Sequence, residues 1–196
     1  AYPLSLAKLA KSEASMTRLD HVVLVDDGGN VTGSAPKAGV HGADTPLHLA
    51  FSCHLFDDSG RVLVTRRALT KLTWPGVWTN SFCGHPRPGE PLEQAVHRHA
   101  LHELGVEIDD LEVILPDFRY RAIDANGVVE NEICPVFRAR VRGSLSPHPA
   151  EVSEVQWSEP HELGVAVRAA PWAFSPWLVL QSEAMAGAIR ATEFSS

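Results

Sequence analysis

Acidic side chains and histidines at short spacings are the residues of this sequence that could do chemistry. Glu130 and Glu132 stand two residues apart in a β-prone segment, so both side chains point to the same face. Two carboxylates on one face repel each other, and either a cation between them or exposure to water relieves that repulsion. Taken alone, the pair favours exposure, because charged side chains are common on outer faces.

Three histidines shift the balance toward a metal site. His41 and His48 bracket a loop that enters a strand, and His85 follows Cys83 in a segment rich in glycine and proline. An isolated histidine is more often structural than a ligand, and chance pairs are expected among ten histidines. Three imidazoles and two carboxylates would form a mixed nitrogen and oxygen site, which suits Mn, Fe, Co or Zn ions and leaves Cys83 free for catalysis.

Strands in the first part of the chain must carry these residues. Residues 21–26 predict a strand that enters a turn at residues 27–30. Residues 49–56 and 61–66 repeat the pattern around a second turn at residues 57–60. An antiparallel sheet is therefore expected.

A helix and two longer strands follow. Apolar residues recur at helical spacing in residues 90–104, and Gly105 is a suitable stop signal. Residues 111–123 and 128–141 predict strands, and the Asn-Gly pair in residues 124–127 predicts a tight hairpin between them.

The remaining pattern completes an α+β architecture. Residues 152–157 predict one more strand, and the chain becomes helical after Pro160 and Pro176. We therefore predict a mixed β-sheet flanked by helices, in a single domain of residues 1–196. Residues 1–18 are interpreted as a loose or weakly helical lead-in.

Charge and hydropathy exclude several classes of function. A formal net charge of -7 argues against a nucleic-acid-binding protein, so any bound anion must meet a local basic pocket. Apolar stretches such as residues 177–180 are far shorter than the ~20 residues that cross a bilayer, which argues against a membrane protein. Three cysteines without a secretory leader favour a reducing, cytoplasmic location.

Part of a known signature runs from a loop into the predicted helix. It comprises Gly84, Glu90, Arg98, Glu103 and Gly105. This spacing resembles the Nudix box, the loop-helix-loop with which that superfamily binds a divalent cation against a diphosphate. The box has glutamates at two further places, where this chain has His99 and His102. A typical Nudix hydrolase is therefore disfavoured.

Several neighbouring motifs carry a more specific resemblance. They are Thr-Arg-Arg-Ala at 65–68, Trp-Pro-Gly-Val-Trp-Thr-Asn at 74–80, Cys-Gly-His at 83–85, Tyr-Arg-Ala at 120–122, Glu-Asn-Glu at 130–132 and Ala-Phe-Ser-Pro-Trp at 173–177. Over residues 37–177 the chain resembles the type I isopentenyl-diphosphate isomerase family. The resemblance implies a Nudix-type fold and the interconversion of isopentenyl diphosphate and dimethylallyl diphosphate, in isoprenoid precursor synthesis.

The resemblance also implies two cation sites. Its ligand set for a first-row divalent ion, Mn²⁺ or another such as Zn²⁺, is His41, His48, His85, Glu130 and Glu132. This is the same set that the spacing brings together. At Glu103 the resemblance implies Mg²⁺ against the oxygens of the diphosphate substrate.

The family reaction adds a proton to the terminal alkene carbon and removes another from C2, through a carbocation-like intermediate. Glu132, close to Tyr120, resembles the proton donor, and Cys83 resembles the group that takes the C2 proton. We expect local positive charge to stabilise the Cys83 thiolate. Trp177 resembles the aromatic residue that faces the carbocation, where a ring face can contribute about 2 kcal/mol.

Basic residues in matching positions imply a diphosphate site. Lys37, Arg67 and Lys71 match the family's phosphate-binding residues, whereas ordinary surface charge is the alternative explanation. His99 stands where the family usually has an arginine. We expect His99 to contact the diphosphate more weakly, because its reach is shorter and it is fully charged only when protonated.

Two other functions compete with the isomerase. A Nudix-fold diphosphohydrolase is disfavoured because the extra glutamates are missing while Cys83, Tyr120 and Glu132 are present. A non-catalytic protein with a structural metal would make Cys83 and Tyr120 incidental, and it would lose its fold without metal but show no turnover with it.

Overall fold

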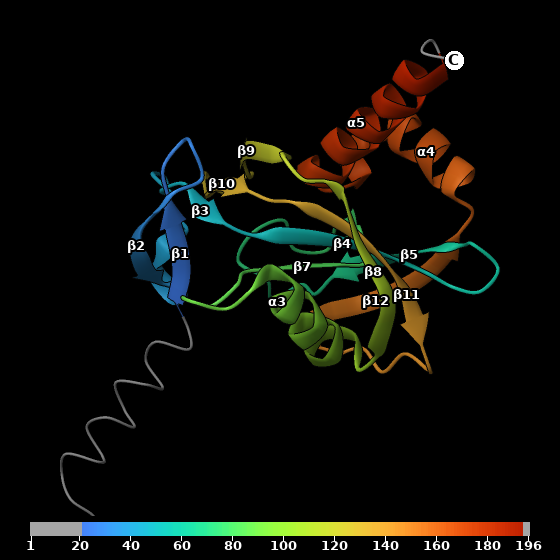
Figure 1. The fold of residues 1–196 in the computed structure, drawn as a ribbon, viewed down its shortest axis with the longest axis horizontal. Coiled ribbons are helices and arrows are strands. Elements are labelled where there is room, and N and C mark those ends of the chain that lie inside the picture. The colour runs from blue at the N-terminus through green and yellow to red at the C-terminus, as the bar shows by residue number, and fades with distance from the viewer. Residues whose placement is uncertain (1–20, 194–196) are drawn as a thin grey trace, which may run out of the picture.

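The computed structural model describes residues 21–193, so the predicted lead-in at residues 1–18 lies outside the described residues. Two β-sheets form the framework (Figure 1). The five-stranded sheet has the order β2-β1-β3-β10-β9. Its strands are β1 (His21–Val25), β2 (Val31–Pro36), β3 (His48–Leu49), β9 (Arg119–Ile123) and β10 (Val129–Ile133).

The seven-stranded sheet holds the larger core. It has the order β12-β5-β4-β11-β8, with β6 paired to β5 and β7 paired to β4. Its strands are β4 (Phe51–Phe56), β5 (Val62–Arg67), β6 (Trp78–Thr79), β7 (Phe82–Gly84), β8 (Glu107–Leu115), β11 (Val136–Arg142) and β12 (Val152–Ser158). Only the β11–β4 pair in this sheet is parallel, so the sheet is mixed as predicted.

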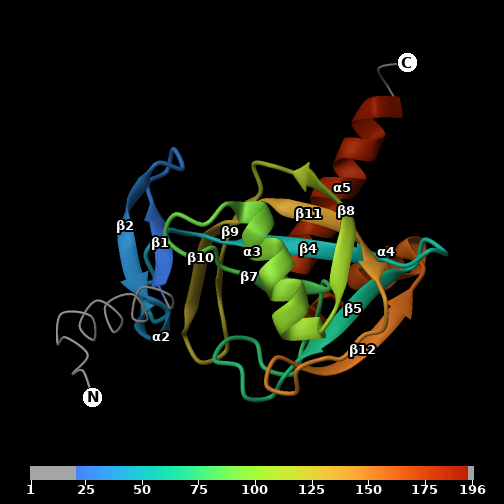
Figure 2. The same ribbon diagram turned by 60° about the horizontal axis from the view of Figure 1, so that its bottom comes forward.

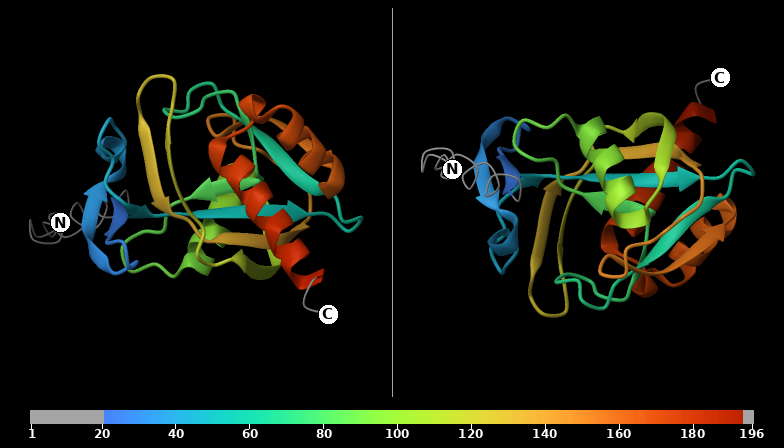
Figure 3. Two further views of the ribbon diagram at one scale, coloured as in Figure 1. Left: turned by 90° about the horizontal axis from the view of Figure 1, so that it is seen from above. Right: turned by 90° about the horizontal axis from the view of Figure 1, so that it is seen from below.

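Helices cover both faces of the seven-stranded sheet. They are α3 (Leu92–His99), η1 (Ala100–Leu104), α4 (Pro160–Ala169), η2 (Pro171–Ala173) and α5 (Pro176–Glu193). The short helix α2 (Lys37–Val40) instead contacts β1 and β2 of the five-stranded sheet. The two views of Figure 3 show α5 in front of the sheet from one side and α3 in front from the other. No helix within residues 21–193 is long and apolar enough to cross a membrane.

Helix α3 packs on the sheet through the apolar face that its sequence predicts. Ala95 and Val96 are fully buried, and they join a core cluster with Phe51 and Phe82. The last turn widens into a π-helical turn, and Gly105 ends it with a left-handed φ of 65°. The predicted helix and its stop at Gly105 are confirmed, and Figure 2 shows this helix across the front of the sheet.

Two segments that we expected as continuous strands are broken. Residues 111–123 divide between β8 and β9, and residues 128–141 divide between β10 and β11. The two members of each pair lie in different sheets. Pro116 and Pro135 stand at the breaks, and a proline cannot donate its backbone nitrogen to a ladder. The expected single sheet is therefore two sheets, whereas the hairpin at residues 124–127 is confirmed.

The chain crosses between the sheets at two neighbouring points. Strand β3 runs into β4 at Ala50, and β10 runs into β11 at residues 134–135. Each of these strands lies parallel to its counterpart, because β10 pairs with β3 and β11 pairs with β4. A pocket of about 610 Å³ opens beside this crossing, and Ala50 lines it.

Candidate active site

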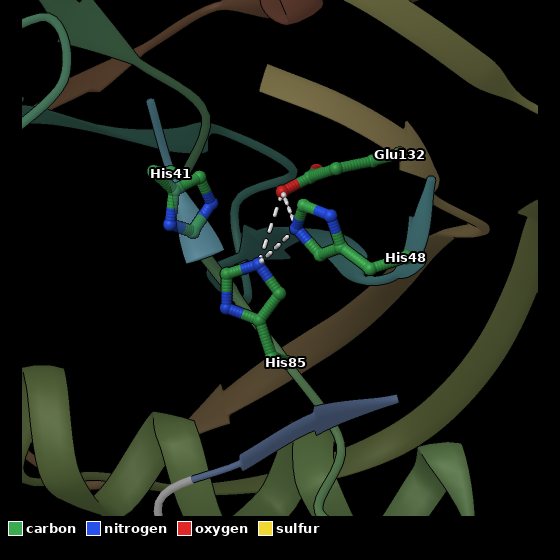
Figure 4. A group of neighbouring side chains, drawn as sticks. All are labelled: His41, His48, His85 and Glu132. Carbon is green, nitrogen blue, oxygen red and sulfur yellow. Dashed lines mark hydrogen bonds and ion pairs between the residues drawn. The ribbon is translucent and has the colours of Figure 1, made fainter. Parts of the chain in front are cut away.

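Four side chains from separate segments converge on one point beside the crossing (Figure 4). His41 follows α2, His48 lies in β3, His85 follows β7, and Glu132 lies in β10. Their possible ligand atoms all lie within 4.8 Å of one another. His85 Nε2 is 3.0 Å from Glu132 Oε1 and 3.2 Å from His48 Nε2. The spacing-based prediction of a histidine and carboxylate cluster therefore matches the geometry.

Strand pairing and a hydrogen bond orient these side chains. Glu132 is the register partner of His48 in the parallel β3–β10 pair. His48 Nδ1 donates to the Pro46 carbonyl at 2.9 Å, which leaves Nε2 directed at the cluster. Histidines that bind metals commonly donate their other ring nitrogen in this way.

Glu90 and Arg98 of the Nudix box fix the backbone at His85. Arg98 donates two hydrogen bonds to the Glu90 carboxylate, at 2.7 and 2.6 Å. A third bond from Arg98 reaches the carbonyl of His85 at 3.1 Å. Glu90 and Arg98 thus position the loop that carries His85.

Glu130 adds a second carboxylate to the cluster. Its Oε2 lies 3.0 Å from His41 Nε2, and its Oε1 accepts a hydrogen bond from Thr73 Oγ1 at 2.8 Å. Buried His41 Nε2 and Glu130 Oε2 nevertheless make no hydrogen bond. Buried polar atoms are rarely left without a partner. These open nitrogen and oxygen atoms fit a divalent cation, which would supply the missing partner.

Electrostatics keep His85 and Glu132 in the form that binds a metal. Burial lowers the pKa of His85 to about 4, so this imidazole is neutral at neutral pH. Burial opposes the ionisation of Glu132, but hydrogen bonds with His48 and His85 outweigh it and hold the Glu132 pKa well below its usual value. Metal binding requires neutral imidazole and ionised carboxylate.

Cys83 lines the same pocket from strand β7. Its Sγ donates to Asn80 Oδ1 at 3.1 Å and lies 3.3 Å from Ser52 Oγ. Burial raises the pKa of Cys83 to about 12, although Ser52, Asn80 and the charge of Arg67 act in the opposite direction. We expected positive charge to stabilise a thiolate here. Desolvation is the larger effect, so Cys83 is held as the thiol.

Aromatic rings enclose the pocket next to Cys83. Trp177, from α5, is only 3% exposed, and its ring centroid lies 5.5 Å from that of Trp74 and 5.7 Å from that of Tyr120. Tyr120 is the register partner of Glu132. Burial, reinforced by the negative charge of Glu132, raises the pKa of Tyr120 well above its usual value, so the phenol keeps its proton.

Basic side chains also line the pocket. They are Lys37, Arg67, Lys71, Arg87, Arg98, His99 and His102. Two of the predicted basic residues are already bonded to other groups of the protein. Lys71 forms an ion pair with Glu151, and Arg67 donates to the carbonyls of Thr73 and Trp74.

His99 and Glu103 meet across one turn of helix. His99 Nδ1 lies 2.7 Å from Glu103 Oε1, and His99 is 6% exposed. The imidazole ring also packs edge-on against Phe51 and lies against the backbone of Gly84, where an added Cβ would be 2.4 Å from the ring. Both residues line the pocket, so His99 combines a packing role with a place in the pocket wall.

Comparison with known proteins shows the family of this chain. Residues 46–178 match the NUDIX domain. The isopentenyl-diphosphate Delta-isomerase of Agromyces mediolanus is 67% identical over 162 residues, which are 83% of this chain and 79% of the relative. The enzyme of the same name from Clavibacter michiganensis subsp. michiganensis is 66% identical over 160 residues, 82% of each chain. The chain belongs to the isopentenyl-diphosphate Delta-isomerase family.

The fold is also found in a more distant protein. A crystal structure from Deinococcus radiodurans superposes with a TM-score of 0.65 at 22% identity, covering 83% of this chain and 97% of that one. This likeness concerns the fold alone. Together with the NUDIX match, it confirms the predicted Nudix-type α+β fold.

The residues that the isomerase family pattern singles out lie in one place. Every predicted site residue lines the pocket except His48, which is fully buried behind it and still reaches Glu132 at 3.4 Å. Sequence reasoning did not single out Asn80, Ser52, Thr73 or Glu151. Asn80 stood inside a quoted motif, whereas the pairing of Glu151 with Lys71 spans 80 residues and carries no local signal.

Proposed function

We propose that this chain interconverts isopentenyl diphosphate and dimethylallyl diphosphate. The observation that carries the proposal is the joint placement of Cys83 and Glu132 on one pocket, which Tyr120, Trp177 and several basic side chains also line. An unactivated alkene is a poor base, so its protonation needs a positioned acid and a site that keeps water away from the cation. These residues supply both.

The two proton carriers divide the reaction between them. In the forward direction, the Glu132 carboxyl group gives its proton to the terminal alkene carbon, and the Cys83 thiolate takes a proton from C2. The products of that step are a Glu132 carboxylate and a Cys83 thiol. The pKa directions favour this same protonation state, lowered for Glu132 and raised for Cys83. The reverse reaction can therefore start at once, while the forward reaction first needs a proton moved from Cys83 to Glu132.

The aromatic side chains that line the pocket suit a carbocation. Trp177 and Tyr120 offer ring faces, and a ring attracts a desolvated cation by ~2 kcal/mol or more. Trp177 Nε1 donates to Asn80 Oδ1 at 3.0 Å, which fixes the orientation of the indole. We infer that these rings hold the hydrocarbon part of the substrate and exclude water from it.

The basic side chains that line the pocket suit the diphosphate. We infer that Lys37, Arg67, Lys71 and His99 bind it, and that Glu103 would hold Mg²⁺ against its oxygens. The first-row ion, Mn²⁺ or Zn²⁺, would be held by His41, His48, His85, Glu130 and Glu132. When bound, these cations would offset the charge of the carboxylates and of the phosphate oxygens.

Metal binding by the cluster predicts a shift in thermal stability. Mn²⁺ at 100 times its dissociation constant should stabilise the folded chain by about 2.7 kcal/mol, or roughly 5 to 10 °C in Tm. His48→Ala should lose most of this shift, because His48 points its Nε2 atom at the cluster. The exposed His161 on α4 provides the matched control, His161→Ala. Equal shifts in both variants, measured by calorimetry, would argue against the site.

The reaction itself can be tested directly. We expect purified protein with isopentenyl diphosphate, Mg²⁺ and Mn²⁺ in deuterated water to form dimethylallyl diphosphate that carries solvent deuterium, detected by NMR. Released phosphate would instead identify a diphosphohydrolase. Unchanged substrate, together with unfolding on metal removal, would identify a structural metal site.

A further inference from the structure

A chain of buried polar side chains runs from Cys83 into the core. Ser52 Oγ lies 3.3 Å from Cys83 Sγ, and it accepts a hydrogen bond from Gln181 Nε2 at 2.9 Å. Gln181 Oε1 in turn lies 3.0 Å from His54 Nε2. Ser52 and Gln181 are fully buried and His54 is 3% exposed, so bulk water does not compete for these bonds.

Asn80 is the other partner of Cys83, and toward the sulfur it can only accept a hydrogen bond. Its Nδ2 donates to the carbonyls of Cys53 and Phe82, at 3.1 and 2.8 Å, and this turns Oδ1 toward Cys83. The Trp177 indole donates to the same oxygen. Asn80 can therefore hold the thiol proton of Cys83, but it offers no donor to the sulfur once that proton has left.

Ser52 is placed to supply the missing donor. Its oxygen already accepts from Gln181, so its hydroxyl hydrogen is available to another acceptor. Two sulfurs lie nearby, Cys83 at 3.3 Å and Cys134 at 3.5 Å. A charged acceptor forms the stronger hydrogen bond, and only Cys83 of these two lines the pocket. The hydroxyl therefore turns toward Cys83 when that sulfur is charged.

His54 determines which way Gln181 faces. Burial lowers the pKa of His54, so its ring is neutral and one ring nitrogen carries the hydrogen. With that hydrogen on Nε2, His54 donates to Gln181 Oε1, and the amide nitrogen of Gln181 faces Ser52. A reversed amide would present an oxygen to Ser52 and would draw its hydroxyl hydrogen away from the sulfur.

We propose that Ser52, oriented by Gln181 and His54, is a positioning residue that donates a hydrogen bond to the Cys83 sulfur while this sulfur is without its proton. The inference rests on the proposed isomerase function. Ser52 transfers no atom: the C2 proton moves to Cys83, and the serine hydroxyl keeps its own hydrogen throughout.

The test compares Ser52→Ala with a matched buried serine. Ser81 is also fully buried, but its hydroxyl bonds only to the backbone of Leu55 and Leu63, at 2.7 Å each. With isopentenyl diphosphate, Ser52→Ala should lower kcat by about 10- to 100-fold, the effect of one hydrogen bond to a charged group, and should leave KM nearly unchanged. Ser81→Ala should lose thermal stability but keep a kcat close to that of the unmodified protein.

A kinetic isotope effect separates positioning from general damage. With substrate deuterated at C2, the isotope effect on kcat should rise in Ser52→Ala, because removal of that proton becomes the slower step. If Ser52→Ala does not fold, Gln181→Met should show the same rise with a smaller loss, about 2- to 10-fold in kcat.

Three outcomes would overturn the proposal. Equal kcat values in Ser52→Ala and Ser81→Ala would show that Ser52 has no special part in catalysis. An unchanged C2 isotope effect would assign the loss to general disturbance of the site. No product from the unmodified protein would refute the isomerase function, and this inference with it, whereas the first two outcomes leave that function intact.

Discussion

Cys83→Ala is expected to lower kcat for isopentenyl diphosphate by about 10²- to 10⁴-fold, the contribution of a positioned acid or base. The substitution removes the group that takes the C2 proton and leaves Glu132 in place. In deuterated water, we therefore expect the variant to exchange hydrogen at the terminal carbon while it forms little dimethylallyl diphosphate. NMR of the substrate and product resolves both events.

A second cysteine provides the control for this substitution. Cys53 is fully buried in the core cluster and does not line the pocket. Cys53→Ala should reduce stability through a small cavity and should keep its activity. If Cys83→Ala and Cys53→Ala were equally active, Cys83 would be a packing residue and the assigned proton acceptor would be wrong.

Glu132→Gln is expected to have the larger effect, a loss of about 10⁴-fold or more in kcat, because the carboxylate has two functions. The amide has the same size, but it cannot carry the proton for the terminal alkene carbon. It also weakens the histidine cluster, since Glu132 Oε1 lies within 3.4 Å of both His48 Nε2 and His85 Nε2. Unlike Cys83→Ala, this variant should not exchange deuterium into the terminal carbon.

Two comparisons check the assignment of Glu132. Glu112 is exposed on β8, so Glu112→Gln should behave like the unmodified protein. The rise in Tm on addition of Mn²⁺ should be smaller in Glu132→Gln than in Glu112→Gln. An active Glu132→Gln enzyme with a normal Mn²⁺ response would remove Glu132 from both of its proposed functions.

The pKa shifts of Cys83 and Glu132 indicate which proton must move before the enzyme can begin another forward turnover. Burial favours the Cys83 thiol and hydrogen bonds favour the Glu132 carboxylate, which together are the state left after forward turnover. Recovery needs one proton to move from the sulfur to the carboxylate. A hydrogen bond from Ser52 to the sulfur would lower the cost of that transfer, since it stabilises the deprotonated form.

Much of the fold was predictable because its signals are local. Turn residues at 27–30, 57–60 and 124–127 mark hairpins, and helical spacing before Gly105 marks α3. The division into two sheets was not predicted. Pro116 and Pro135 mark the breaks, but which sheet each half-strand joins depends on partners far along the chain, such as the pairing of β11 with β4.

Residue types and motif spacing determined the chemistry of the site: three imidazoles, two carboxylates, a thiol and a cationic group within one Nudix-related pattern. Only the tertiary structure decided the state and partners of those groups. Burial keeps Cys83 as a thiol where we expected a thiolate, Lys71 is paired with Glu151, and Ser52 lies beside Cys83 while it bonds to Gln181, 129 residues further along the chain. The reason is physical: reactivity depends on desolvation and on hydrogen-bond partners, and both arise only when distant segments pack together.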